Sequence, residues 1–138
     1  KMDVTMAMNG AIAGLVAITA GPSAPSAGAA VLIGAAGGVL VYFSILFFDK
    51  KLKIDDPVGA ISAHGIVGIL GVMVVPLTSD TSIVHQLIGV IAIAGFTFAA
   101  SLITISVINS FMPIRATDEE QYVGLDSSEI GVEAYPEF

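Results

Sequence analysis

Charged residues divide this chain into long apolar stretches. None lies between Val4 and Phe48, between residues 57 and 79, or between residues 81 and 114. Each stretch exceeds the roughly 20 residues that a helix needs to cross about 30 Å of hydrocarbon. The first is long enough for two crossings, and the Gly, Pro and Ser residues of 21–28 interrupt it with a turn. The pattern predicts four membrane-spanning helices, at about 3–20, 28–48, 57–77 and 83–112.

The second and fourth spans differ in character. The second is crowded with Gly and Ala, and Gly34 and Gly38 have the spacing that lets helix backbones approach closely in lipid. The fourth covers about 30 residues, or about 45 Å of helix, which exceeds the hydrocarbon thickness. We therefore expect this helix to tilt or to project beyond the membrane.

The composition agrees with a membrane protein. The mean hydropathy is +0.91 and 55% of the residues are apolar, far above the norm for soluble domains. Without cysteine there are no disulfides or thiolate metal sites, and five basic residues give no support for nucleic-acid binding. We expect an all-α membrane protein, with a helical bundle over 1–112 and an acidic tail over 113–138. Because the chain starts abruptly and without Met, we expect a C-terminal piece of a longer protein.

The basic residues predict the orientation. Four spans place the loop 49–56 and the tail on one side, and the loops 21–27 and 78–82 on the other. All the basic residues fall on the first side: Lys1, Lys50, Lys51, Lys53 and Arg115. Under the positive-inside rule that side is cytoplasmic. We expect a multi-pass protein of the cell membrane, surrounded by lipid, with a cytoplasmic C-terminus.

His64 is the only ionisable side chain within the third predicted span. Ionisable groups at membrane depth are costly and usually face a pore, a water file or a partner. An imidazole also changes its charge near neutral pH. Helical spacing places Ala60, His64, Gly68 and Gly71 on one face, with Gly65 on the adjacent flank. We expect a functional role for His64; the alternative is a structural ring satisfied by a neighbouring helix.

Other polar residues near the spans have simpler explanations. Asp56 suits an N-cap with Pro57 at the first helical position. Capping and the helix dipole then explain Asp55 and Asp56 better than acid–base chemistry or a metal site. Asn9 lies near the cytoplasmic end of its span, and a satisfied amide and a pore-mouth role are equally compatible with that position. His85 is predicted near the outer interface, where a titratable ring costs little.

The sequence shows no nucleophile–base pair and no metal-ligating constellation. We therefore expect neither an enzyme nor a bound cofactor or metal.

The tail from Asp118 carries seven of the twelve acidic residues. A solvated tail that repels anionic headgroups is one interpretation. Its apolar residues favour a docking segment equally: Tyr122, Val123, Leu125, Ile130, Val132, Tyr135 and Phe138.

Three segments resemble the ammonium transporter family, the ammonium and methylammonium permeases related to the Rhesus glycoproteins. The segment NGAIAGLV at 9–16 is similar to the opening of the family's eighth helix. KIDDP at 53–57, followed by AHGIVG at 63–68, is similar to its tenth, and EEQYVGLD at 119–126, with the later Ala134-Tyr135, to its tail. The match covers nearly the whole chain, as the last four of eleven membrane helices plus the cytoplasmic tail.

The resemblance implies a homotrimer with one narrow pore per subunit for ammonium or ammonia. It makes His64 the second of two hydrogen-bonded pore histidines, the first lying outside this chain. Asn9 matches a polar position near the cytoplasmic mouth. Near the same mouth, this chain carries Gly59 at a position where some relatives can have an acidic residue. The tail is implied to pack against a neighbouring subunit and to couple to a PII-type regulatory protein. The tail positions that match the family's motif are Tyr122, Gly124, Leu125 and Asp126.

The implied task is to pass ammonium while rejecting K⁺, an ion of similar size and charge. A dry, apolar passage makes any cation costly, but ammonium escapes that cost by giving up its proton. Neutral imidazoles can hydrogen-bond NH₃ and relay the proton, and desolvation favours their uncharged form. Whether the net flux is NH₃ or NH₃ with H⁺ stays open. An ammonium sensor on the same scaffold and a purely structural membrane subunit are the alternatives.

Overall fold

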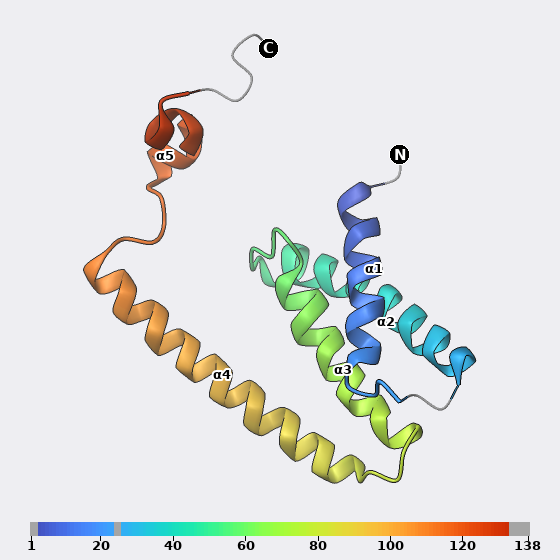
Figure 1. Ribbon diagram of the computed structural model, residues 1–138. Helices are drawn as coiled ribbons and strands as arrows, with labels where there is room; N and C mark the ends of the chain where they lie inside the picture. The colour runs from blue at the N-terminus through green and yellow to red at the C-terminus, as the bar shows by residue number, and fades with distance from the viewer. Residues whose placement is uncertain (1–2, 24–25, 133–138) are drawn as a thin grey trace. The chain divides into compact units, whose positions relative to one another are not determined.

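The computed structural model describes residues 3–23 and 26–132, and every element within these ranges is helical. The residues outside them include Lys1, Ala134, Tyr135 and Phe138. With η for π or 3-10 helices, the elements are α1 (Val4–Thr19), α2 (Ala27–Phe47), η1 (Phe48–Leu52), η2 (Ile61–Ile66), α3 (Val67–Val74), η3 (Val75–Leu77), α4 (Ile83–Phe111), α5 (Asp118–Val123) and η4 (Asp126–Ile130) (Figure 1). The chain divides into two units, Lys1–Ile93 and Ala94–Phe138, each described here by itself.

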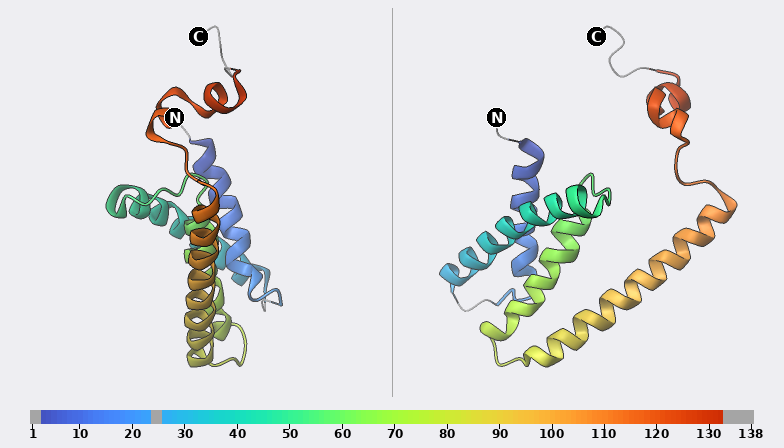
Figure 2. Two further views of the ribbon diagram at one scale, coloured as in Figure 1. Left: turned by 90° about the vertical axis from the view of Figure 1, so that its left-hand side faces the viewer. Right: turned by 180° about the vertical axis from the view of Figure 1, so that it is seen from behind.

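Three helices pack together in the N-terminal unit. They are α1, α2 and the continuous helix through η2, α3 and η3, and each contacts the other two. The views of Figure 2 show α2 crossing α1, with the third helix against both. The turn after α1 reaches the end of the third helix, since a Cβ on Gly21 would lie 3.9 Å from both Val75 Cγ2 and Thr78 Oγ1. The loops that follow α1 and η3 therefore lie at the same end of the unit.

Small residues let α1 and α2 approach backbone to backbone. A Cβ on Gly14 would lie 3.2 Å from the carbonyl oxygen of Gly34, and one on Gly38 would lie 3.5 Å from that of Gly10. The expected close approach at Gly34 and Gly38 is thus confirmed, and its partner is α1. Such contacts supply dispersion energy where lipid offers no hydrophobic driving force.

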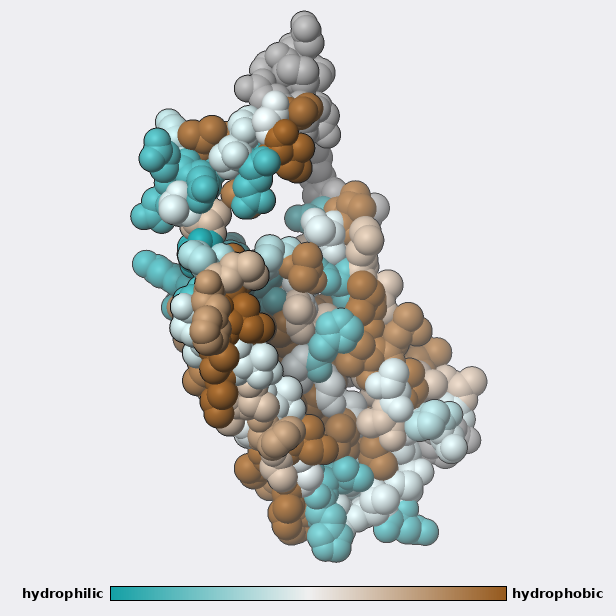
Figure 3. All heavy atoms as spheres, turned by 60° about the vertical axis from the view of Figure 1, so that its left-hand side comes forward, coloured by the Kyte–Doolittle hydropathy of each residue, from teal (hydrophilic) through white to brown (hydrophobic). Residues whose placement is uncertain are grey.

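The core of this unit is small. Its buried apolar residues are Ala13, Ala17, Val41, Ala63 and Val67. Many large apolar side chains are exposed instead, and hydrophobic side chains cover much of the surface visible in Figure 3. All of α4 shares this character, because none of its residues is buried within the chain. This distribution suits apolar surroundings rather than water.

Two helices are long and apolar enough to cross a membrane. They are Ala27–Leu52, of 26 residues, and Ile83–Phe111, of 29 residues. The helices Val4–Thr19 and Ile61–Leu77 are apolar but shorter. The third helix begins at Ile61 rather than at the expected Pro57. Pro57 and Val58 form a turn, and Gly59 has a φ of +68°, which a right-handed helix does not allow.

In the C-terminal unit, the end of α4 and the start of α5 are defined by side-chain hydrogen bonds. The amide of Ile114 donates to Asn109 Oδ1 at 3.1 Å, just after α4 ends. A capping box begins α5, in which Glu120 N–H donates to Thr117 Oγ1 and Thr117 N–H donates to the Glu120 carboxylate. Each bond satisfies a backbone donor that the helix start would otherwise leave free.

Candidate functional site

His64 lies in a widened helical turn. The element η2 is a π-helix, and the amide of Val67 donates to the carbonyl of Ser62, five residues earlier. Such single wide turns are rare and are frequent at functional sites. The turn adds a residue to the helical path and rotates the residues before it relative to those after it by up to about 100°.

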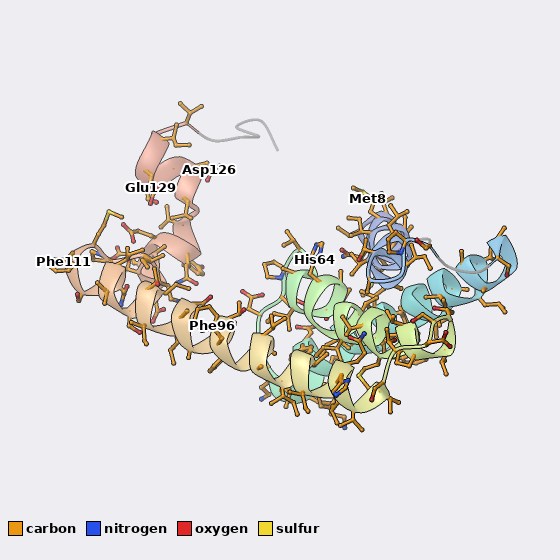
Figure 4. The ribbon with its side chains drawn as sticks, turned by 60° about the horizontal axis from the view of Figure 1, so that its bottom comes forward. Met8, His64, Phe96, Phe111, Asp126 and Glu129 are labelled. Carbon is orange, nitrogen blue, oxygen red and sulfur yellow. The ribbon has the colours of Figure 1, made fainter. Side chains whose placement is uncertain are left out.

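The wide turn separates His64 from the buried face of its helix. Ala63 and Val67 are 1% and 0% exposed and belong to the core, whereas His64 is exposed. Figure 4 shows the His64 ring projecting away from its helix. A Cβ on Gly68 would meet nothing within 4 Å, so the space beside that residue is also open.

The predicted grouping of Ala60, His64, Gly68 and Gly71 on one helix face is wrong for Gly71. Gly71 does not accompany His64, because a Cβ there would lie 2.9 Å from the carbonyl oxygen of Ala17. Gly71 is buried against α1 and continues the row of Ala63 and Val67. Simple α-helical spacing groups Gly71 with His64, and the wide turn breaks that spacing. Gly65, by contrast, is exposed, and a Cβ there would meet only Ile61 Cγ2, at 4.0 Å.

The Asp56 side chain caps this helix across an intervening turn. Its Oδ1 accepts from the amide of Ile61 and its Oδ2 from the amide of Ser62, both at 3.0 Å. The amide of Gly59 donates to the Asp56 carbonyl at 2.9 Å, which closes the intervening turn. One carboxylate therefore satisfies two of the free donors at the helix start. Asp55 and Pro57 lie beside it and are exposed.

Asn9 lies beside Gly59. Asn9 is 8% exposed, and a Cβ on Gly59 would lie 2.9 Å from both its Nδ2 and its Oδ1. Within the described part of the chain, the Asn9 side chain forms no hydrogen bond. The structure thus brings Asn9 to the turn that starts the His64 helix, a contact that sequence spacing did not indicate.

Two buried hydroxyls are a further feature that sequence analysis missed. Ser44 on α2 and Ser62 on η2 have oxygens with no hydrogen-bond partner among the described residues. Serine is common in apolar helices, where its hydroxyl often bonds to the preceding turn, so neither residue gave a signal.

The tail residues form a separate, tightly turned segment. Gly124 has a φ of +102°, and its amide donates to the Glu120 carbonyl at 2.8 Å. Asp126 Oδ1 accepts from the amide of Ser127 at 3.0 Å. Tyr122 is 93% exposed, and Leu125 is exposed as well.

Hydrogen bonds from Thr117 control the ionisation of one tail carboxyl. The backbone amide of Thr117, and secondarily its hydroxyl, hold the pKa of Glu120 below its ordinary value. Both bonds favour the charged carboxylate because it is the better acceptor. Within the described ranges, no three His, Asp or Glu side chains are grouped so that they could hold a metal ion.

Comparison with known proteins identifies relatives of this chain. A model described as the Ammonium Transporter Family matches residues 1–135. The ammonium transporter Amt1 of Haloferax mediterranei is 35% identical, over 100% of this chain and 28% of its own length. The ammonium transporter of Bacillus subtilis is 33% identical, over 98% and 37%. Amt1 of Archaeoglobus fulgidus is 32% identical, over 93% and 36%. The chain spans about a third of the length of these curated relatives.

Proposed function

This chain belongs to the ammonium transporter family, and on that premise we propose that the full-length protein carries ammonium across the cell membrane. Its family and its apolar helices indicate a membrane protein. The observation that carries the proposal is an exposed imidazole, His64, in a helix that is otherwise uncharged. That side chain faces away from the core of its own unit, as a group that lines a passage must.

The proposed mechanism uses the cost of moving a cation into an apolar passage. Ammonium and K⁺ meet the same cost, but only ammonium can lose its charge by giving up a proton. The released proton stays with water on the entry side or is relayed through ring nitrogens, and NH₃ passes His64, whose ring in its neutral form offers one donor and one acceptor nitrogen. Asn9 lies toward the cytoplasmic mouth of this passage. The first pore histidine and the other pore walls belong to helices outside this chain.

We extend the proposal to the assembly. The four helices cross the membrane as the last part of an eleven-helix subunit, and three subunits form a homotrimer. The segment that contains Lys50, Lys51 and Lys53 is cytoplasmic, as is the tail. The apolar residues of the tail pack against a neighbouring subunit and connect it to a PII-type regulator. The exposure of Tyr122 and Leu125 supports such a contact.

Uptake by purified protein tests this function. The full-length protein in lipid vesicles should accumulate radiolabelled methylammonium faster than protein-free vesicles, and ammonium should compete. His85→Ala serves as the matched control for changes at His64, because His85 is exposed at the start of α4. Uptake equal to that of empty vesicles, from protein shown to be folded, would contradict the proposal.

A further inference from the structure

The contact between Asn9 and Gly59 joins α1 to the start of the His64 helix. Gly59 is buried, its φ is +68°, and the amide of Asn9 fills the place where a side chain at position 59 would stand. With no Cβ, Gly59 accepts both the backbone angle and the close neighbour. No hydrogen bond of the Asn9 side chain competes with this packing role among the described residues.

Gly59 in turn fixes the first bond of the helix. Its carbonyl accepts from the amide of Ala63 at 2.7 Å, and its own amide donates to the carbonyl of Asp56. The Asp56 carboxylate holds the amides of Ile61 and Ser62. The residues directly before His64 therefore have their amides bonded to Asp56 or Gly59. A displacement of Gly59 moves this set and carries His64 with it.

The other side of the contact is firmly placed. Asn9 lies one helical turn before Ala13 and two before Ala17, both fully buried in the core. Gly71 holds the far part of the His64 helix close to the same α1, because a Cβ there would lie 2.9 Å from the carbonyl oxygen of Ala17. Between these two contacts the helix contains the wide turn of η2.

We infer that Asn9 is a positioning residue for His64: its side chain packs against Gly59 and so sets where the wide turn presents the imidazole. This assignment rests on the proposed transport function. It gives Asn9 a packing role rather than a contact with the permeating molecule.

A double-mutant cycle in the full-length protein tests the inference. Gly59→Ala drives a Cβ into the Asn9 amide, and Asn9→Ala removes that amide. A displacement of about 1 Å can cost up to about 100-fold in rate, so each variant should lower methylammonium transport per folded protein and weaken the rejection of K⁺. In the Asn9→Ala background, Gly59→Ala should cost at least about threefold less than in the wild type, because the clash is gone. An equal cost in both backgrounds would overturn the inference.

Two further variants separate positioning from mere loss of folded protein. Gly10→Ala is the matched control on α1, since its Cβ would meet nothing within 4 Å. It should leave the KM and the K⁺ rejection unchanged. Asn9→Leu keeps the approximate shape without the amide and should restore the K⁺ rejection that Asn9→Ala loses. Failure of Leu to restore it, with Asn9→Ala impaired, would assign the amide a polar role and contradict the packing role.

A readout without transport keeps the two proposals distinguishable. The ring resonances of His64, identified by their loss in His64→Ala, should shift in Asn9→Ala and Gly59→Ala but not in Gly10→Ala. Absence of transport in the wild type with these shifts present would remove the proposed function and leave the positioning contact standing. Unshifted His64 resonances in Asn9→Ala and Gly59→Ala would overturn the positioning role itself.

Discussion

A single imidazole in an uncharged helix has few stable arrangements. It must hydrogen-bond a neighbour, face water or stay neutral in an apolar space. His64 is exposed from its own unit, and the amides that precede it are bonded to Asp56 and Gly59. These bonds therefore hold the backbone that leads to His64, while no residue in the described ranges hydrogen-bonds the ring nitrogens.

Gly124 provides a prediction at a single residue. Its φ is +102°, and a Cβ there would lie 2.7 Å from Asp126 Oδ1. Gly124→Asp adds backbone strain, a steric clash and a second negative charge at that point. We expect it to lower transport by the full-length protein without abolishing trimer assembly. Gly131→Asp is the control, because Gly131 shares a positive φ and no described residue outside its immediate chain neighbours has an atom within 4 Å of its Cβ position. Equal transport by the Gly124 and Gly131 variants would contradict the assigned role of the turn.

Glu120 provides a prediction for pH. Its pKa is lowered from an ordinary value of 4.5 by the Thr117 bonds, so the folded state favours the charged form. The contribution of the capping box to α5 is therefore fully present above that ordinary value and is lost as the pH falls through the lowered pKa. Hydrogen exchange at the amides of Thr117 and Glu120 should be slow at about pH 6 and, after correction for intrinsic rates, should lose protection progressively as the pH falls below the ordinary value of 4.5. In Thr117→Ala the Glu120 amide loses its side-chain acceptor, so its protection should be weak over the whole of this pH range; unchanged protection of that amide would contradict the box.

Close helix packing predicts a stability effect at the scale of elements. Gly37 lies where three helices meet, since a Cβ there would stand 2.7 Å from Ala17 Cβ and 3.2 Å from Val67 Cγ1. Gly37→Ala should destabilise the protein by about 1–3 kcal/mol, as overpacking does. Gly10→Ala introduces the same methyl group into open space and should be neutral or stabilising by up to about 1 kcal/mol. Thermal unfolding in detergent compares them, and equal midpoints would contradict this packing.

The helices differ in how far the sequence predicts them. Long uncharged runs place α2 and α4 within a residue of their observed starts, because apolar length alone defines them. The third helix starts at Ile61 and not at the predicted Pro57: Asp56 does cap it, but across a turn that depends on the positive φ of Gly59. The π turn was not predictable, because no local residue pattern specifies it. For the same reason the sequence groups Gly71 with the face of His64, where the structure does not place it.

The whole molecule has a predicted orientation that labelling can test. Within the N-terminal unit, the turn after α1 lies near Val75 and Thr78, while Asn9 lies beside Gly59. The helix α1 and the third helix therefore run in the same direction, as the first and third crossings of an up-and-down bundle must. This supports the proposed topology. This chain contains no cysteine, so Lys51→Cys and Ser79→Cys can be introduced singly into the full-length protein, with the unsubstituted protein as the labelling background. An impermeant thiol reagent added outside intact cells should label position 79 and not position 51, and the reverse pattern would contradict the orientation.

Selectivity of the purified full-length protein tests the central claim most directly. Vesicles with equal ammonium and K⁺ gradients should show ammonium flux and no K⁺ flux above that of protein-free vesicles. In His64→Ala, ammonium flux should fall by about 100-fold, the lower end of what a positioned proton-transfer group contributes, or K⁺ should begin to pass. His85→Ala should match the wild type in both fluxes. Unchanged ammonium flux together with unchanged K⁺ rejection in His64→Ala would contradict the account and leave His64 a structural residue.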